Sequence, residues 1–271
     1  MEKTKYRAKT IDDLFVVEGL CAVSQLEKEQ KTKETWFIVG GMATQSYLPS
    51  FCRRPTSDID LALLKPLTYS DFKDYCKPIK EYLQDRGFLV EERKGHNAYI
   101  LIYENKEEEK GIIEFARRNE KNISRIIKRL EKEMENSRIK LIEGRNEVYR
   151  VSSPEDIVSP KIVRGIRTLR DYEELKEYLD TPYPLTNERI TEDLRKIEEI
   201  RSEARLLEGD LSLAARLRFV SDIYDIRVLS ELTGFNKEYL KESLNRWENI
   251  KGETPEKKIL FEKILPFIKI D

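Results

Sequence analysis

The sequence predicts an α+β fold: a mixed sheet with flanking helices, followed by a C-terminal helical bundle. Short apolar runs typical of strands occur only up to Val151. From Pro154 onward, apolar residues recur with helical spacing. The run Thr181-Pro182-Tyr183-Pro184 is rich in turn-forming residues and is the best candidate for a linker. We therefore expect one domain over residues 1–183 and a helical domain over residues 184–271.

The first expected elements are a helix, a strand and a second, short helix. Thr10 and Asp13 form the pattern of a capping box, which predicts a helix that continues past Cys21. A strand is expected at residues 36–39. The two glycines that follow it predict a turn into a short helix over residues 42–47.

A second strand, beginning at Asp58, is expected before a helix that runs from Ser70 to Leu83 and ends at Gly87. Further strands and one more helix complete the first domain. The expected antiparallel strands lie at residues 88–92, 98–103 and 111–116, the helix at 122–134, and a hairpin at 138–142 and 147–151.

A strong helix start lies at Ser153-Pro154-Glu155-Asp156, because it combines a cap, a proline in the first turn and acids near the helix N-terminus. Pro160 falls inside this helix, and we expect it to bend or interrupt the helix just before Lys161. Apolar stripes predict the later helices at residues 190–200, 213–220, 236–247 and 254–265.

The charges of the chain are balanced, with 50 Lys and Arg against 51 Asp and Glu. A globally basic nucleic-acid binder is therefore excluded, and any such contact must come from a local patch. Charged residues make up 37% of the chain, a share that resembles thermophile proteins. The candidate basic groups are Arg117, Arg118 and Lys121; Arg164, Arg167 and Arg170; and Arg216 and Arg218.

The three cysteines and the single His96 show no spacing of a disulfide framework or a zinc site. The N-terminal residues are polar and lack the apolar segment of a signal peptide. No window is apolar enough to span a membrane. We expect a soluble, cytoplasmic protein without a membrane partner.

Asp58 and Asp60 occupy alternate positions of the second strand, so both side chains point to one face, about 7 Å apart. Two carboxylates this close repel each other unless a cation lies between them. Paired oxygen ligands suit Mg²⁺, which also binds substrate phosphates. The glycines at 40 and 41 allow a phosphate to approach the backbone at the start of a helix.

Glu114 is the candidate for a third acid of the same site. It lies between Ile113 and Phe115 in an apolar strand, where burying an unpaired carboxylate is costly. The alternative, that Glu114 faces solvent on a half-exposed sheet, remains open at this stage.

The stretch from Val39 to Leu61 resembles the nucleotide-binding signature of the DNA polymerase β-like nucleotidyltransferase superfamily. The resemblance implies a nucleotidyltransferase-type sheet, in which the glycine turn binds the triphosphate and the two aspartates bind catalytic Mg²⁺ or Mn²⁺. Sixteen residues separate Gly41 from Asp58, so we expect a small insertion near Cys52. By the same resemblance, the nucleotide-binding residues are Gly40, Gly41, Thr44, Arg54 and Thr56, and Glu114 is a metal ligand or general base.

A second resemblance is to the abortive-infection nucleotidyltransferase toxins of the AbiEii type. It is carried by Asp156-Ile157-Val158 followed by Lys161, and by Arg170-Asp171 followed by Glu174. It implies that Lys161 contacts the nucleotide phosphates and that Asp171 completes the active site.

Together the motifs predict a metal-dependent enzyme that transfers a nucleoside monophosphate from an NTP, such as ATP, and releases pyrophosphate. The toxin resemblance implies RNA, notably the 3′ end of tRNA, as the acceptor, and a separate antitoxin as a partner. One alternative moves the same chemistry to a small molecule or a protein hydroxyl. Another is a non-catalytic nucleotide-binding or toxin–antitoxin interaction protein. The intact Asp58 and Asp60 favour an enzyme.

Overall fold

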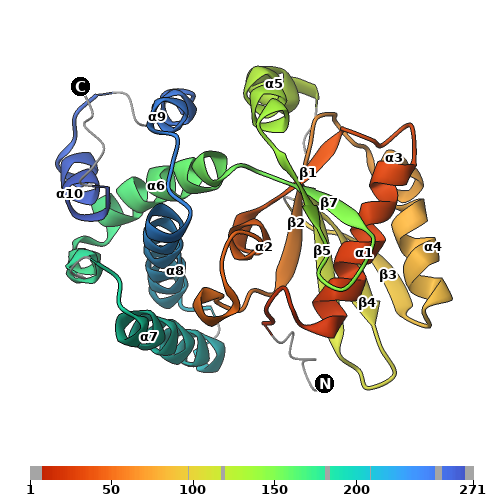
Figure 1. The fold of residues 1–271 in the computed structure, drawn as a ribbon, viewed down its shortest axis with the longest axis horizontal. Coiled ribbons are helices and arrows are strands. Elements are labelled where there is room, and N and C mark those ends of the chain that lie inside the picture. Colours follow the sequence, from red (N-terminus) through yellow and green to blue (C-terminus); the bar gives the residue numbers. More distant parts are fainter. Residues whose placement is uncertain are drawn as a thin grey trace. The chain divides into compact units, whose positions relative to one another are not determined.

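The computed structural model describes residues 8–96, 98–116, 120–180, 184–207, 209–247 and 252–265 (Figure 1). The chain forms two compact units. The sheet unit comprises Met1–Ser46 and Arg53–Ser153, and the helical unit comprises Tyr47–Cys52 and Pro154–Asp271. The limit at 183/184 expected from the linker stays a prediction, because residues 181–183 lie outside the described residues.

The sheet unit contains a seven-stranded mixed sheet in the order β3-β4-β5-β2-β1-β7-β6. Strand β2 lies at its centre, paired antiparallel to β1 and parallel to β5. The mixed sheet and the expected hairpin of β6 and β7 are confirmed. The strands are β1 (Trp36–Val39), β2 (Asp58–Leu63), β3 (Leu89–Lys94), β4 (Ala98–Glu104), β5 (Lys110–Ala116), β6 (Arg138–Leu141) and β7 (Val148–Val151).

Three helices cover one face of this sheet, and aromatic side chains form the core between the helices and the strands. The Phe15 ring stacks on Tyr103 with centroids 4.8 Å apart, and Phe72 meets Phe115 edge-on at 5.2 Å. Such pairs add stabilisation beyond the apolar area they bury. The helices on this face are α1 (Leu14–Lys28), α3 (Tyr69–Tyr75) and α4 (Lys77–Asp85).

The other face carries α5 (Glu120–Glu135), whose Ile123 and Leu130 pack against Phe37 of β1 and Ala62 of β2. Because side chains alternate along a strand, Asp58 and Asp60 share this face with Ala62. The short helix α2 (Gly40–Gln45) begins where β1 ends. The acids and the glycine turn are therefore held by adjacent, rigid elements of one unit.

Several helix starts differ from the sequence expectation, and two of these differences have a clear physical cause. The N-cap of α1 is Asp13, whose side chain accepts from the Phe15 N–H, so the helix begins after Asp13 and not at Thr10. The single helix expected from Ser70 is two helices that divide at Cys76. Pro78 in the first turn of α4 has no N–H to donate, which favours a new helix start there.

The helical unit confirms the expected C-terminal helices. Helix α6 runs unbroken through Pro160, so the expected interruption before Lys161 is wrong, and the expected bend stays a prediction. Proline costs this helix the hydrogen bond to the Asp156 carbonyl, and burial of the residues on both sides of it offsets that loss. The elements are η1 (Ser50–Cys52), α6 (Pro154–Asp171), η2 (Glu173–Leu179), α7 (Asn187–Leu206), α8 (Leu211–Leu232), α9 (Lys237–Asn245) and α10 (Pro255–Ile264). Among the described helices, none has the length and apolar character needed to cross a membrane.

Candidate metal and nucleotide site

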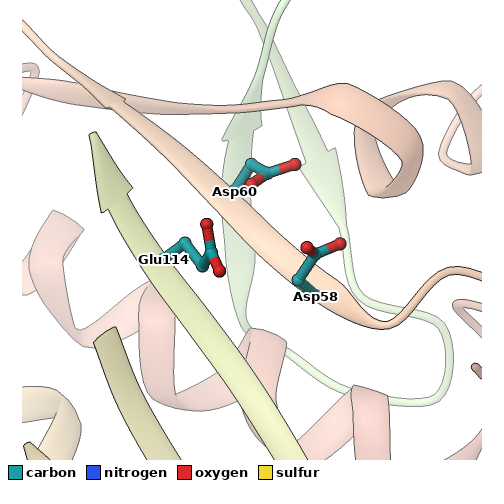
Figure 2. Close-up of side chains that lie close together, drawn as sticks. All are labelled: Asp58, Asp60 and Glu114. Atoms are coloured by element: carbon teal, nitrogen blue, oxygen red, sulfur yellow. The ribbon is translucent and has the colours of Figure 1, made fainter. Parts of the chain in front are cut away.

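Three carboxylates, here called the acidic triad, meet on the α5 face of the sheet: Asp58, Asp60 and Glu114. Asp60 lies directly opposite Glu114 in the parallel pairing of β2 and β5. One oxygen from each of the three residues lies within 4.8 Å of the others. Figure 2 shows the two aspartates on the same side of β2, with Glu114 reaching toward them from β5. The Glu114 carboxylate therefore lies beside the two aspartates, and the alternative of an isolated, solvent-facing side chain is wrong.

The acidic triad is half-buried, and this environment disfavours its charged form. Burial raises the pKa of Asp58, while a hydrogen bond from Thr56 and the charge of Arg54 lower it in part. Burial also raises the pKa of Glu114, and the negative charge of Asp58 adds to that shift. Bringing these acids together is unfavourable without a compensating cation. Half-buried carboxylates are also hard oxygen ligands, so the cluster fits a divalent metal site.

These shifts predict how the stability of the metal-free protein depends on pH. A raised pKa means that the folded state keeps a proton that the unfolded state releases, so the stabilisation is present near the usual aspartate pKa of 3.8 and is lost as the pH rises through the raised value. In EDTA, wild type should lose stability relative to Asp58→Asn as the pH rises above the usual aspartate pKa of 3.8. Urea unfolding of both proteins across this range measures the difference.

Saturating Mg²⁺ should remove the difference in pH dependence, because the cation replaces the proton as the compensating charge. If the two metal-free proteins show parallel pH profiles, the pKa of Asp58 is not raised in the folded protein.

The glycine turn, Gly40 and Gly41, adjoins the acidic triad. Gly40 has φ +72, a conformation that favours glycine, and a Cβ added there would overlap Oδ2 of Asp60. A Cβ on Gly41 would lie 2.9 Å from Thr56 Oγ1 and 3.4 Å from the Arg54 guanidinium. Both glycines thus permit the start of α2 to approach the acids more closely than any other residue would.

Thr56 and Arg54 surround the first aspartate of the acidic triad. The Thr56 hydroxyl donates to Asp58 Oδ1 at 3.2 Å, which orients that carboxylate. The charge of Arg54 lowers the pKa of Asp58, so the two groups lie close enough to interact. Arg54 and Thr56 also lie close to Gly41, so four of the five residues expected to bind the nucleotide lie at the glycine turn. The fifth is Thr44.

Thr44 is buried, and its hydroxyl donates to the Gly40 carbonyl at 3.1 Å. Lys161 and Asp171 belong to the helical unit. The Lys161 amine is buried between Asp222, at 3.1 Å, and Asp225, at 2.8 Å, whereas Asp171 is exposed at the end of α6. The roles expected for these three residues stay predictions.

The three groups of basic residues that the sequence offers for contact with a nucleic-acid backbone differ in their exposure and in their partners. Arg164 and Arg216 have partners: Arg164 pairs with Asp222, and Arg216 donates to the Tyr178 hydroxyl. Arg167, Arg170 and Arg218 are exposed. Arg117 and Arg118, and the side chain of Lys121, lie outside the described residues.

Lys9 is a further contributor that the sequence does not indicate. Its N–H donates to the Thr56 carbonyl, and its own carbonyl accepts from the Thr56 N–H, both at 2.9 Å. This isolated β-bridge holds the segment that carries Thr56 directly before the acidic triad. No local motif marks such a pairing, because the partners are far apart in the sequence and only backbone atoms take part.

Lys9→Pro is expected to weaken divalent-ion binding by roughly fivefold, because it removes one backbone hydrogen bond of this bridge, worth about 1 kcal/mol. Lys9→Ala keeps both backbone bonds and loses side-chain contacts, namely the pairs with Asp13 and Glu109 and the contact with the Phe15 ring, so it should bind the ion like wild type. Mn²⁺ titration followed by electron paramagnetic resonance compares them. Equal losses in the two variants would show that the side chain, and not the bridge, supports the site.

No protein-family model matches the sequence, and none of the curated proteins does either. Among solved structures, the chain is similar to an antigenic nucleotidyltransferase-like protein from Paracoccidioides brasiliensis, at 17% identity and a TM-score of 0.36, over 73% of this chain and 93% of that one. It is also similar to MenT4, a nucleotidyltransferase toxin from Mycobacterium tuberculosis, at 14% identity and a TM-score of 0.39, over 92% of this chain and 86% of that one.

Both of these proteins are described as nucleotidyltransferases or nucleotidyltransferase-like, which is the class that the sequence motifs predict. Both TM-scores are below 0.5, and the features of this chain that point to a function are its acidic triad and its glycine turn.

Proposed function

We propose that this chain is a metal-dependent nucleotidyltransferase, which moves a nucleoside monophosphate from an NTP to an acceptor hydroxyl and releases pyrophosphate. One observation carries the proposal: three carboxylates from two adjacent strands converge within 4.8 Å, next to a glycine turn that opens a helix. A structural role alone does not explain this arrangement, because the three acids destabilise each other unless a cation is present.

In this proposal, Asp58, Asp60 and Glu114 hold Mg²⁺ or Mn²⁺, which when bound stabilises the negative charge that develops on the transferred phosphoryl group. The N–H groups of the glycine turn bind the β- and γ-phosphates, and the Thr44 hydroxyl assists after exchanging its present acceptor. Arg54 and Thr56 keep Asp58 oriented and ionised.

Glu114 has a second role in the proposal. In place of binding the metal, its carboxylate can act as the general base that takes the proton of the attacking acceptor hydroxyl. For Lys161 we keep the proposed contact with the leaving phosphates, which requires its amine to exchange Asp222 and Asp225 for phosphate oxygens. Asp171 is kept as the proposed last member of the active site.

The acceptor we favour is RNA, such as the 3′ end of tRNA, in a toxin-like role in the cytoplasm with an antitoxin as partner. This choice rests on the sequence motifs, and the description of MenT4 as a nucleotidyltransferase toxin agrees with it. A small-molecule or protein hydroxyl would use the same acidic triad. The non-catalytic alternative, a nucleotide-binding or interaction protein, does not require the converged carboxylates.

The test is to incubate the full chain with each α-labelled NTP, Mg²⁺ and total RNA. We expect pyrophosphate release and label on RNA, and neither with the Asp58→Ala/Asp60→Ala variant. Acceptor binding should weaken steeply with salt if the acceptor is RNA. Label on protein or on a small molecule would keep the chemistry and replace the acceptor. Absence of label and of pyrophosphate with every NTP would refute the proposed activity.

A further inference from the structure

The edge strand β6 (Arg138–Leu141) has one neighbour, β7, among the described strands. Its other side is a sheet edge that can pair with an additional strand. The opposite edge, β3, is protected differently: Glu91 forms a two-bond ion pair with Arg93, and Glu92 pairs with Lys80. Strand β6 contains no acidic residue, and its two charged side chains are the cations Arg138 and Lys140.

The backbone of Ile139 and Leu141 points away from β7. The Ile142 N–H donates to the Glu147 carbonyl at 2.9 Å, so this pair is a hydrogen-bonded pair of the hairpin. Hydrogen-bonded pairs alternate along an antiparallel ladder, which makes Lys140 and Arg138 the next residues that bond to β7. The N–H and C=O groups of Ile139 and Leu141 are therefore directed outward.

The same two residues expose large apolar side chains. Ile139 is 48% exposed and Leu141 is 66% exposed, and their i, i+2 spacing places both on one face of the strand. An added strand would thus satisfy their outward backbone groups and cover their side chains in a single step.

The positive charges of β6 determine which kind of strand can pair with it. Arg138 and Lys140 alternate with the apolar residues, and burial together with the neighbouring Arg138 lowers the pKa of Lys140. A second copy pairing antiparallel through β6, with Ile139 opposite an apolar residue, would set Lys140 against Lys140 or Arg138 of that copy. Like charges directly opposite each other are destabilising. An acidic residue on the added strand, directly opposite Lys140, would be favourable instead.

We propose that β6 is a docking site for an extended segment of another protein, in which acidic and apolar residues alternate. The apolar residues of that segment lie over Ile139 and Leu141, and its acidic residues lie opposite Arg138 and Lys140. The segment extends the sheet beyond β6, so this site is separate from the acidic triad on β2 and β5.

The test uses the full chain and a fluorescein-labelled octapeptide of alternating valine and glutamate, with fluorescence anisotropy as the readout. A valine–lysine octapeptide is the matched probe, and it should bind roughly tenfold more weakly or worse. Ile139→Pro removes one outward N–H and no bond to β7, so it should abolish binding without unfolding the chain. Arg138→Glu/Lys140→Glu should reverse the preference between the two peptides.

The proposal fails if neither peptide binds, if both bind equally, or if Ile139→Pro binds the acidic peptide like wild type. It also fails if gel filtration shows a concentration-dependent dimer that Ile139→Pro abolishes, because the occupant would then be a second copy. Circular dichroism of each variant separates loss of binding from loss of fold.

Discussion

Asp60→Asn should slow nucleotidyl transfer by roughly a thousandfold or more, because the substitution removes one of the charges that hold the catalytic metal. Asp60 lies between the other two acids and the glycine turn: it faces Glu114 across the sheet, and its carboxylate adjoins Gly40. Asparagine keeps the shape of the side chain, so the loss reports charge and not packing. Single-turnover rates with saturating NTP, together with Mn²⁺ titration, measure the two effects.

Glu104→Gln is the matched control for Asp60→Asn. Glu104 ends β4 of the same sheet and pairs with Lys110 at 3.1 Å, outside the acidic triad. This variant should transfer at the wild-type rate. The metal-free Asp60→Asn protein should also be at least as stable as wild type, since it has lost a repelling charge. A slow rate combined with unfolding would mean that Asp60 supports the fold instead of the reaction.

Gly40→Ala should reduce transfer by roughly a hundredfold, because displacing a catalytic group by about 1 Å has effects of this size. The added Cβ would overlap Oδ2 of Asp60, so either that carboxylate or the turn must move. The left-handed conformation of Gly40 adds a backbone cost of about 1 kcal/mol. Rates and thermal unfolding of the same preparation measure both losses.

Gly87→Ala separates these two causes. Gly87 also has a positive φ, +82, but a Cβ there would meet nothing within 4 Å. It should therefore lose stability by about 1 kcal/mol and keep wild-type activity. If Gly40→Ala behaves in the same way, the close approach of the turn to Asp60 is not needed for the reaction.

Much of the sheet unit could be predicted from the sequence, because the residue patterns that indicate its strands and its turn are local. The alternation of Asp58 and Asp60 with Ile59 and Leu61 follows from the two-residue period of a strand, and the structure buries the apolar pair. The glycine turn could be predicted because the left-handed backbone conformation found at Gly40 favours glycine.

Helix boundaries were harder to predict, since several residues near a helix start can act as caps. Thr10 and Asp13 both suit that role, and the structure uses Asp13. Pro160 predicts a bend or an interruption of α6, but the burial of most of that helix offsets the local cost of the proline, and the helix is not interrupted.

By itself, the sequence determined the strands, the glycine turn and the shared face of the two aspartates, because each depends on neighbouring residues along the chain. Only the tertiary structure decided that Glu114 lies opposite Asp60, that Lys9 holds Thr56, and that the Lys161 amine lies between Asp222 and Asp225. These contacts join residues far apart in the chain. The free energy that selects them comes from packing whole elements together, so no local pattern of residues contains them.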